Sequence, residues 1–512
     1  MAIPIESVPL LDTAAGVIHV RRPADGSPLE DVKIHDATQV TEIAARLRQA
    51  QVEWEGIGVR GRTEWLSRMR QWLLDNEDRL IEISREEGGR VRNEPLLETI
   101  LMVEVIDYYT RVASKLMSPK RVRGASPLVL GKRFTVNRSP YPLVGVIGAW
   151  NFPLLLTFGD AIAALFAGSA VLLKPSEVTP LAVRELVRGW RDEIGAPPVL
   201  DILLGGGETG AALVDAADFI QFTGSVATGK RVAQRAAETV TPISLELGGK
   251  DPCLVLDGAN LNRAVNCAVY GGFANNGQVC MGFERVYVEA GVYDEFVERV
   301  VAKVKSLRSG IDDHSDIGAL TSAPQIDIVD AQVRDAVAKG AKVLTGGHRM
   351  NRPGTWYAPT VLVDVDHSMT IMREETFGPV LPIVRVADVD EAVCLANDSE
   401  FGLSATIFAD TTKRAEQIAA RLEVGAVNIN DFLANMTCAE LPQGGWKNSG
   451  IGSRASASGL LKFTRTKVIS SSWLPAMDSE PNWFPYTPTR WRIFRGAARL
   501  VHGRGLGRLG IS

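Results

Sequence analysis

The stretch Leu143-Val144-Gly145-Val146-Ile147-Gly148-Ala149 opens the part of the chain that decides the fold. It is an apolar run of strand length, and a helical pattern over 158–166 and a second apolar run over 170–173 follow it. The alternation continues with helices predicted over 180–194, 210–216 and 226–237 and strands predicted over 200–204 and 219–222. Short apolar strands that alternate with helices indicate a parallel sheet covered on both faces. We therefore predict a Rossmann-like α/β domain of the dinucleotide-binding type.

The segments on either side complete the predicted organisation. Upstream, apolar residues at helical spacing predict helices over 36–54, 63–74 and 77–83, and β-rich residues over 120–141 predict a projecting hairpin. Downstream of Gly249, a second α/β domain is predicted from helices over 260–272, 292–306 and 325–339 and strands over 285–288 and 342–344. A further α/β layer is expected over 388–397 and 412–421. The predicted divisions are 1–119 with 142–248, then 249–462, then strands in 120–141 and 463–475, and a C-terminal extension over 476–512.

Composition excludes several classes of protein. The 512 residues are 46% hydrophobic and 23% charged with a net charge of −4, which offers no general electrostatic reason to bind nucleic acid. Five cysteines without a C-x-x-C pair favour a reducing compartment over a disulfide framework. The six histidines lack metal-ligand spacing, so no metal site is predicted. We see no signal-peptide pattern and no apolar window of membrane-spanning length, and we expect a cytoplasmic protein.

One cysteine stands apart because of the sequence around it and elsewhere. It lies in Phe273-Ala274-Asn275-Asn276-Gly277-Gln278-Val279-Cys280-Met281, after a run of small and amide residues. A cysteine is by default a small buried hydrophobe, but further motifs accompany this one. They are Trp150-Asn151-Phe152-Pro153, Leu172-Leu173-Lys174-Pro175-Ser176-Glu177, Phe222-Thr223-Gly224-Ser225, Leu245-Glu246-Leu247-Gly248-Gly249-Lys250 and Glu374-Glu375-Thr376-Phe377-Gly378-Pro379. In this order, from about 36 to 467, the chain resembles the NAD(P)-dependent aldehyde dehydrogenase superfamily of the non-phosphorylating, hydrolytic type.

Two glycine-containing turns compete for the phosphates of the implied cofactor. Residues 205–210 match G-x-G-x-x-G after a predicted strand, although a lone match is weak in a glycine-rich chain. Phe222-Thr223-Gly224-Ser225 follows the next strand and opens a helix, whose N-terminus and the Ser225 hydroxyl favour an anion. The resemblance assigns the pyrophosphate to this second turn, through Phe222, Gly224 and Ser225, and the adenosine pocket to the upstream glycines, including Gly207.

The resemblance also implies which residues bind the rest of the cofactor. Lys174 and Glu177 leave a strand end together, and their ordinary interpretation is a solvated pair on a turn. As ribose ligands, they would include a carboxylate that repels a 2′-phosphate, so Glu177 favours NAD, with NADP as the alternative. The remaining cofactor residues implied are Trp150, Ser176, Leu247, Glu375, on the nicotinamide ribose, and Phe377, against the ring. Lys250 matches a position near the active site, and a surface lysine is its alternative interpretation.

Aldehyde oxidation requires that the carbonyl first become a group that carries a transferable hydride. A thiolate achieves this by adding to the carbonyl to form a thiohemiacetal, and Cys280 is the predicted nucleophile. The Asn151 side-chain amide and the Cys280 backbone N–H are the predicted oxyanion donors, against the alternative of an ordinary turn asparagine. Glu246 is the predicted general base for thioester hydrolysis. A glutamate is ordinarily a solvated charge, but its setting between Leu245 and Leu247 predicts burial and a raised pKa.

The predicted substrate pocket is apolar. The helix after Asn151-Phe152-Pro153 contains Asp160 and no arginine that would bind a distal carboxylate, as semialdehyde enzymes of the family often do. An entrance built from Phe152, Leu155, Leu156, Phe158 and Met281 indicates aliphatic or aromatic aldehydes. Gln443 departs from the aromatic residue usual in the family and changes the expected polarity of the pocket. Succinic semialdehyde is the alternative substrate, because length and late motif resemble some bacterial enzymes of that kind.

The sequence leaves rival functions open. A CoA-acylating relative would cleave the thioester with CoA rather than water, and the presence of Glu246 disfavours it. A non-catalytic protein of the same fold would be expected to lose Cys280 or Glu246. The resemblance further implies a homodimer or homotetramer, bridged by the hairpin over 120–141 paired with a strand at about 464–472.

The C-terminal extension carries a pattern of its own. Thr487-Pro488 is a plausible N-cap and first helical residue, and Trp491, Phe494, Ala498 and Val501 then fall on one helical stripe. The arginines around this stripe are Arg490, Arg492, Arg495 and Arg499, and no acid follows Glu480. We expect a helix docked on its own or a neighbouring subunit. The alternative is a basic amphipathic segment in peripheral contact with an anionic membrane.

Overall fold

The first sheet has the strand order β20-β10-β9-β6-β7-β8. Its strands are β6 (Leu143–Ile147), β7 (Ala170–Lys174), β8 (Leu200–Ile202), β9 (Phe219–Thr223), β10 (Ile243–Glu246) and the short β20 (Gly450–Ile451). All neighbours are parallel except β20, which pairs antiparallel with β10. The chain runs from β6 outward to β8 and then returns to the other side of β6 with β9. A topological switch point therefore lies between β6 and β9, where ligands of open α/β sheets bind.

Helices cover this sheet as the alternation predicted. The helices that contact the sheet are α1 (Ala37–Gly56), α5 (Asp160–Ala167), α6 (Leu181–Arg188), α7 (Gly207–Ala216) and α8 (Val226–Glu238). Three more pack on these helices: α2 (Gly58–Asp75) on α1 and α5, α3 (Glu77–Gly88) on α6, and α4 (Asn93–Met117) on α5. Asp36 caps α1 in a reciprocal capping box with Gln39, which explains why the helix begins there. Trp54 of α1 meets Trp190 edge to face with ring centroids 6.1 Å apart, so these buried rings join α1 to the segment after α6.

Two π-helical turns modify the predicted helices. The helix predicted over 158–166 is preceded by the π turn η2 (Leu155–Gly159), and the helix predicted over 180–194 ends in the π turn η3 (Gly189–Glu193). A π turn holds more residues per turn than an α-helix and rotates the side chains beside it. The faces of 155–159 therefore differ from those of a regular α-helix.

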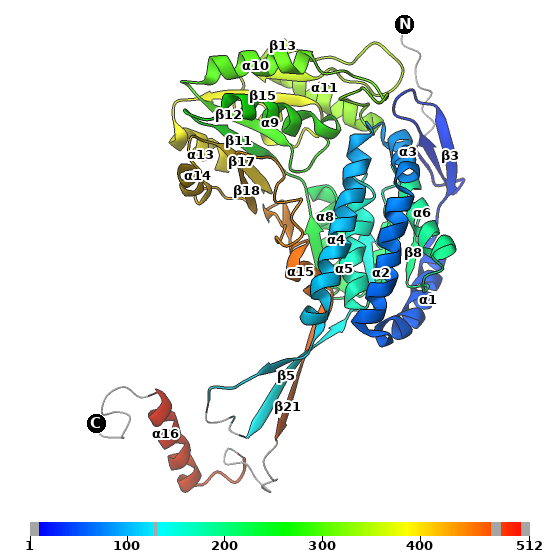
Figure 1. Cartoon of the computed structure of the whole chain (residues 1–512), viewed down its shortest axis with the longest axis vertical. Helices are drawn as coiled ribbons and strands as arrows, with labels where there is room; N and C mark the ends of the chain where they lie inside the picture. Colours follow the sequence, from blue (N-terminus) through cyan, green and yellow to red (C-terminus); the bar gives the residue numbers. More distant parts are fainter. Residues whose placement is uncertain (1–9, 127–128, 130, 473–482, 503–512) are drawn as a thin grey trace. The chain divides into compact units, whose positions relative to one another are not determined.

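The second sheet is a single seven-stranded layer of order β13-β14-β15-β12-β11-β17-β18. Its strands are β11 (Asp251–Val255), β12 (Phe283–Glu289), β13 (Lys342–Thr345), β14 (Thr360–Val363), β15 (Val380–Val386), β17 (Ser404–Phe408) and β18 (Ala426–Ile429). Only β13 runs antiparallel to its neighbour. The helices around it are α9 (Leu261–Phe273), α10 (Tyr293–Lys305), α11 (Ala323–Ala338), α12 (Thr370–Arg373), α13 (Val389–Asn397) and α14 (Thr412–Ala419). The upper part of Figure 1 shows this sheet in green to yellow with its helices.

The expected further α/β layer over 388–397 and 412–421 is wrong. The helix α13 packs on β11, β12 and β15, and α14 packs on β17 and β18, all in the same sheet. The apolar cores on the two faces of that sheet show why: strands buried on both faces need helices on both. These helices therefore complete the second domain.

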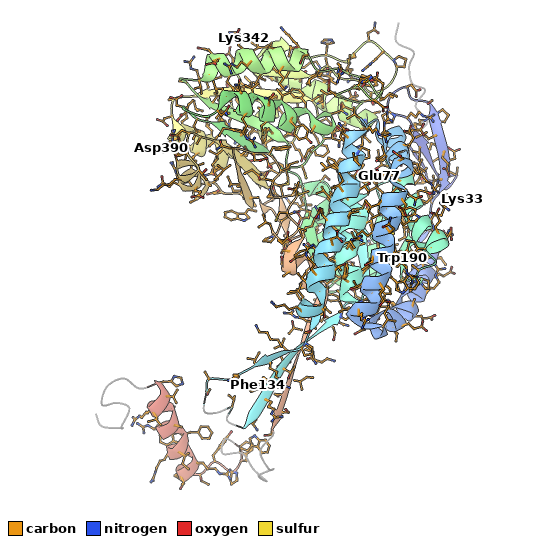
Figure 2. All side chains as sticks on the ribbon, viewed as in Figure 1. Lys33, Glu77, Phe134, Trp190, Lys342 and Asp390 are labelled. Carbon is orange, nitrogen blue, oxygen red and sulfur yellow. The ribbon has the colours of Figure 1, made fainter. Side chains whose placement is uncertain are left out.

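Three smaller sheets complete the architecture. One has the order β1-β2-β3, formed by β1 (Leu11–Asp12), β2 (Val17–Arg21) and β3 (Pro28–Lys33), and another pairs β16 (Phe401–Gly402) with β19 (Trp446–Lys447). The third has the order β21-β5-β4, formed by β4 (Lys120–Val122), β5 (Lys132–Pro140) and β21 (Thr464–Ser472). The predicted hairpin and its C-terminal partner strand thus form one sheet, with Phe134 on β5 labelled in Figure 2.

The computed structural model describes residues 10–126, 129, 131–472 and 483–502. The chain forms two units, one of 1–113 with 140–463 and the other of 114–139 with 464–512. The second unit contains the β21-β5-β4 sheet and the helix α16 (Pro488–His502). The predictions that fall on 1–9, on part of the hairpin at 127–128 and 130, and on 473–482 and 503–512 lie outside the described residues.

Candidate active site

Cys280 follows a backbone reversal that few residue types tolerate. Asn275, Asn276 and Gly277 have φ values of 48°, 58° and 73°, in the left-handed region where asparagine and glycine are favoured. A side chain at Gly277 would also place its Cβ 2.1 Å from the Gly378 carbonyl oxygen. The amide-rich stretch ahead of Cys280 is therefore a requirement of the turn that carries the thiol between η4 (Ala274–Gly277) and β12.

Hydrogen bonds join this turn to the predicted oxyanion donor. The Asn151 Nδ2 donates to the Gln278 carbonyl oxygen at 2.9 Å, and the Asn275 Nδ2 donates to the Asn151 carbonyl oxygen at 2.9 Å. Gln278 is itself held by Thr321, whose backbone N–H donates to the Gln278 Oε1 at 3.0 Å. Asn151 is 3% exposed, so its side chain is buried beside this turn. One of its two amide hydrogens is committed to Gln278, which orients the other.

A cavity of about 910 Å³ lies at the switch point of the first sheet, within the size range of cofactor sites. Every residue that was predicted to bind the cofactor lines it, together with all three predicted catalytic residues. They are Trp150, Lys174, Ser176, Glu177, Gly207, Phe222, Gly224, Ser225, Leu247, Glu375 and Phe377, with Asn151, Glu246 and Cys280. The residues come from seven separate stretches, and the five that follow or end strands of the first sheet meet at its carboxyl edge.

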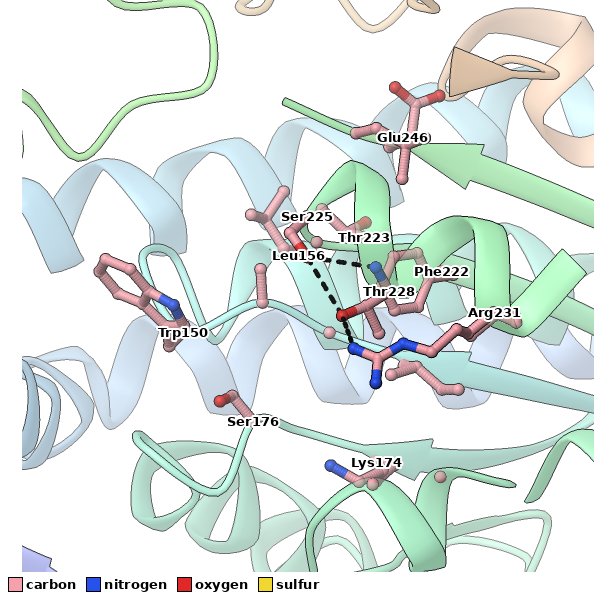
Figure 3. A pocket seen from close by; sticks show the side chains of 18 of the residues that line it. Trp150, Leu156, Lys174, Ser176, Phe222, Thr223, Ser225, Thr228, Arg231 and Glu246 are labelled. Carbon is pink, nitrogen blue, oxygen red and sulfur yellow. Dashed lines mark hydrogen bonds between the residues drawn. The ribbon is translucent and has the colours of Figure 1, made fainter. Parts of the chain in front are cut away.

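One end of this cavity is suited to an anion. Ser225 caps α8, and Figure 3 shows its hydroxyl between the Thr228 backbone N–H and the Thr228 Oγ1, to which Arg231 also donates. A helix N-terminus with a hydroxyl and a guanidinium beside it fits a pyrophosphate. We did not predict Arg231 from the sequence, although a cation near the start of a helix that binds an anion is a visible signal. The upstream glycine turn also lines this cavity, with Gly206, Gly207 and Gly210.

Lys174 and Glu177 do not form a solvated pair. Lys174 is 4% exposed, and its Nζ lies 3.5 Å from the Glu177 Oε2 and donates to the Pro175 carbonyl oxygen at 3.1 Å. Burial lowers the pKa of Lys174, and Glu177 partly offsets the shift. A buried lysine and a carboxylate that both line the cavity fit the hydroxyl groups of a ribose, with Glu177 opposing a phosphate there.

Replacing Glu177 by Gln is expected to raise kcat/KM for NADP relative to NAD by about tenfold, because the change removes a negative charge that repels the 2′-phosphate. Steady-state kinetics with both cofactors at a fixed aldehyde concentration measure this ratio. Glu42→Gln, at an exposed position of α1, is the matched control. An unchanged ratio in Glu177→Gln would show that the carboxylate points away from the ribose.

Glu375 lines another part of the cavity. Its Oε1 accepts a hydrogen bond from the Gly249 backbone N–H at 3.0 Å, and burial raises its pKa to about 8. The Trp150 and Phe377 rings meet edge to face, with centroids 5.2 Å apart. Lys250 is 1% exposed, forms an ion pair with Glu284 and donates to the Thr376 Oγ1, so the surface-lysine interpretation is wrong.

A second cavity, of about 80 Å³, lies on the other side of Cys280. It is lined by Phe152, Leu156, Met281 and Gln443, the four residues predicted for the substrate pocket. Cys280 and Glu246 line both cavities, so thiol and carboxylate stand where the two meet.

Two details of the predicted pocket change. Phe158, in the π turn η2, is fully buried in the core and lies outside the cavity lining. The Gln443 Nε2 donates to the carbonyl oxygens of Asn435 and Met436, both at 3.3 Å. Its amide therefore holds the pocket wall, and it adds less polarity to the pocket than the sequence suggested.

The two reacting groups are both buried. Burial raises the pKa of the Glu246 carboxyl to about 7, while the charges of Arg454 and Lys462 limit the rise. Burial raises the pKa of the Cys280 thiol to about 12, again with Arg454 acting in the opposite direction. The thiol is therefore protonated at rest, and a proton acceptor is needed beside it. Among the described residues nothing donates a hydrogen bond to the Glu246 Oε1, which leaves that oxygen free to take a proton or orient water.

The sequence did not predict the pair of Arg454 and Asp160, whose charges act on Glu246. Arg454 donates from Nε and Nη2 to the two Asp160 carboxylate oxygens at 2.7 and 2.8 Å, and from Nη2 to the Thr223 Oγ1 at 2.8 Å. Burial alone would lower the pKa of Arg454, but Asp160 and Glu246 outweigh it and raise that pKa. Lys462 donates to the Gln221 Oε1 at 2.6 Å, and burial lowers its pKa to about 8. An acid inside the apolar helix α5 was the signal that a buried cation should exist.

Known proteins resemble this chain in sequence and fold. The sequence model described as Aldehyde dehydrogenase family matches residues 11–469. The chain is 40% identical over 486 residues to the 4,4'-diapolycopene aldehyde oxidase of a Methylomonas species, covering 94% of this chain and 90% of that protein. It is 39% identical over 476 residues to a Mycobacterium ulcerans protein with the provisional name succinate-semialdehyde dehydrogenase, NADP(+), 2, covering 91% and 90% of the two chains.

Solved structures agree with these relatives. The lactaldehyde dehydrogenase of Escherichia coli is 31% identical and superposes with a TM-score of 0.85, covering 89% of this chain and 96% of that one. The betaine aldehyde dehydrogenase of Staphylococcus aureus, solved in complex with NAD+, is 28% identical with a TM-score of 0.86, covering 93% and 95%. With a family match over nearly its whole length, the chain belongs to the aldehyde dehydrogenase family of NAD(P)-dependent oxidoreductases.

Proposed function

We propose that this enzyme oxidises apolar aliphatic or aromatic aldehydes to carboxylic acids with NAD, through a covalent intermediate on Cys280 that water hydrolyses. The observation that carries the proposal is the position of Cys280 and Glu246 at the junction of a large cavity with an anion-binding end and a small apolar cavity. A nucleophile at such a junction faces the cofactor on one side and the aldehyde on the other.

The first step belongs to Cys280. Its Sγ adds to the carbonyl carbon while Glu246, with a pKa of about 7, accepts the thiol proton. The carbonyl oxygen becomes the oxyanion of a thiohemiacetal, towards which Asn151 directs its second amide hydrogen. NAD(P), when bound, accepts the hydride that leaves the former carbonyl carbon, and a thioester remains on Cys280.

The second step belongs to Glu246. Glu246 first releases the thiol proton to solvent, and its carboxylate then takes a proton from water as the water oxygen attacks the thioester carbonyl carbon. The carbon–sulfur bond breaks, the acid leaves, and the proton held by Glu246 passes to the sulfur and restores the thiol. Because Glu246 is present, buried and able to titrate near neutral pH, water replaces CoA as the acyl acceptor in this proposal, and the CoA-acylating alternative is disfavoured.

The substrate class follows from the small cavity. Its walls include Leu101, Phe152, Leu155, Val279 and Met281. An adjoining cavity shares Leu101 and Leu155 with it. The flexible methionine side chains of this wall allow it to accommodate ligands of different shape. The relative named 4,4'-diapolycopene aldehyde oxidase acts by its name on an apolar aldehyde, which agrees with this interpretation.

Succinic semialdehyde is the second candidate, and one observation favours it. Relatives carry that name, and Arg454 lines the small cavity as a cation that could meet a carboxylate. Asp160 already holds two nitrogen atoms of that guanidinium, however, and its negative charge opposes a second carboxylate. The apolar aldehyde therefore remains the first candidate.

Hexanal is expected to be oxidised with a kcat/KM about a hundredfold above that of succinic semialdehyde, because a carboxylate in the small cavity would lose its hydration without a free partner. Absorbance of NADH with hexanal, benzaldehyde and succinic semialdehyde measures this order, and Cys280→Ala is the control that should lose all turnover. Preference for the semialdehyde would assign Arg454 to the substrate carboxylate. Turnover only in the presence of CoA would reject hydrolysis.

We also propose a homodimer or homotetramer that works in the cytoplasm. The β21-β5-β4 sheet exposes the apolar side chains of Val122, Val468 and Ile469. A neighbouring copy would cover such a face. A dimeric or tetrameric mass in light scattering tests the assembly. The cytoplasmic location rests on the odd cysteine count.

A further inference from the structure

The end of the chain has a charge opposite to that of the remainder. From Pro481 to Ser512 the only ionised side chains are those of Arg490, Arg492, Arg495, Arg499, Arg504 and Arg508. The net charge of −4 for the whole chain therefore divides into +6 for this segment and −10 for residues 1–480. A segment with this charge is attracted to an anionic surface.

The structure places the described part of this segment in the helix α16, drawn in red in Figure 1. Thr487 caps the helix, with its Oγ1 accepting a hydrogen bond from the Arg490 backbone N–H at 3.3 Å. Within the described part of the chain, none of the residues of α16 is buried. The helix is thus formed by its own capping and spacing, and both of its faces are exposed.

The residues of α16 separate into a basic stripe and an apolar face. Arg492, Arg495, Arg499 and His502 follow each other at intervals of three or four residues, which places them on one side of an α-helix. The apolar face covers the opposite half of the circumference. It contains Trp491, Ile493, Phe494, Ala497, Ala498, Leu500 and Val501. Of these, Trp491, Ile493 and Leu500 are 61%, 60% and 65% exposed.

One arginine would interrupt the apolar face, but it is engaged elsewhere. Arg490 donates from Nη1 to the carbonyl oxygens of Trp483 and Pro485, at 3.0 and 3.4 Å. Its guanidinium is turned back to the segment before the helix and ties the two together. In that segment Trp483, Phe484 and Tyr486 are 54%, 76% and 75% exposed. Tryptophan and tyrosine, whose rings carry a polar N–H or O–H group, prefer the boundary between headgroups and acyl chains.

We propose that residues 483–502 form a docking surface for an anionic lipid bilayer. The apolar face of α16 and the preceding aromatic rings enter the headgroup region, and Arg492, Arg495 and Arg499 contact lipid phosphates. The contact is peripheral, since no helix among the described residues is long and apolar enough to cross a membrane.

A protein partner is the rival occupant, including a neighbouring copy of this chain. A partner would need an apolar groove flanked by acids that matches both the helix and the aromatic segment before it. A bilayer needs no such match, because its interface accepts any helix of this charge and polarity. Docking also brings the enzyme to aldehydes that partition into lipid, a consequence that rests on the proposed function.

Sedimentation with vesicles tests this proposal on the full-length protein. The probes are vesicles of phosphatidylcholine alone and of phosphatidylcholine mixed with phosphatidylglycerol, each at low and high salt. The test variant combines Arg492→Glu, Arg495→Glu and Arg499→Glu. The matched control combines Arg60→Glu, Arg191→Glu and Arg334→Glu, which changes the net charge equally at side chains that are 96%, 66% and 72% exposed.

The wild-type protein and the control are expected to bind the anionic vesicles, and the test variant to bind at least tenfold more weakly, since each arginine near an anionic surface contributes on the order of 1 kcal/mol. High salt should weaken the wild-type binding. Turnover of hexanal in the absence of vesicles should be equal in all three proteins, which separates loss of docking from loss of folding or of the proposed activity. Equal vesicle binding by the test variant and the control would overturn the proposal. A smaller mass of the test variant in light scattering, with vesicle binding retained, would assign α16 to a neighbouring subunit instead.

Discussion

Replacing Glu246 by Gln is expected to lower steady-state turnover by a factor of about 10² to 10⁴, the usual contribution of a general base. The amide cannot accept a proton from water, so the thioester on Cys280 accumulates. The first equivalent of NADH per active site should form more slowly than in the parent enzyme, because Glu246 also accepts the thiol proton, and the hydrolytic phase should be slower still. Rapid mixing with hexanal, followed by absorbance, separates the two phases. Glu298→Gln, at an exposed position of α10, is the control and should behave as the parent enzyme.

The pH dependence provides a second readout for the same residue. Burial raises the pKa of the Glu246 carboxyl to about 7, and only the ionised form accepts a proton. In the parent enzyme kcat is therefore expected to rise with pH through about 7 and to level off above it. In Glu246→Gln this limb should vanish. Persistence of the limb in the variant would assign it to another group, and a variant with normal steady-state turnover would remove Glu246 from the hydrolytic step.

Replacing Arg454 by Met is expected to destabilise the protein by about 3 to 5 kcal/mol, because it leaves a buried carboxylate without its partner. The Asp160 side chain is 2% exposed, and both of its oxygen atoms accept hydrogen bonds from Arg454. Urea unfolding followed by circular dichroism measures the loss. The double variant Asp160→Asn with Arg454→Met is the control, since it removes both charges and should recover much of the stability. A midpoint unchanged in Arg454→Met would contradict the buried pair.

Arg454 is also expected to act on Glu246 as a positioning residue. Its charge favours the ionised form of the Glu246 carboxyl, so its removal raises that pKa above about 7. The rising limb of kcat should then move to higher pH in Arg454→Met. Arg454→Lys keeps the charge and should leave the limb close to that of the parent, although a lysine cannot reproduce the forked contact with Asp160. A limb that stays in place in Arg454→Met would reduce Arg454 to a structural role.

Much of the site was predictable from the sequence because each part of it is local. Asn151 follows β6, Glu177 follows β7, Ser225 follows β9 and Glu246 ends β10. Parallel strands bring their carboxyl ends to one edge, so the motifs at strand ends had to converge. The turn ahead of Cys280 was visible for the same reason, since Asn275, Asn276 and Gly277 suit the conformation that it needs.

What escaped the sequence involves side chains that meet across long separations or a local change of helix type. Arg454 meets Asp160 across 294 residues, and no spacing rule relates the two. Lys250 could have been a surface residue until Glu284 was placed beside it in the core. Phe158 was predicted at the pocket entrance, but it lies within the π turn η2 and is buried in the core.

The sequence by itself determined the family and the α/β fold, and it predicted the nucleophile, the base and the oxyanion donor, because these depend on contiguous motifs and on the periodicity of strands and helices. Only the tertiary structure decided what surrounds them. Burial and neighbouring charge set the pKa values of Cys280 and Glu246, and both depend on groups such as Arg454 that arrive from distant parts of the chain. Periodicity reports which face of an element is buried, whereas electrostatics depends on distances through space, and those exist only in the folded protein.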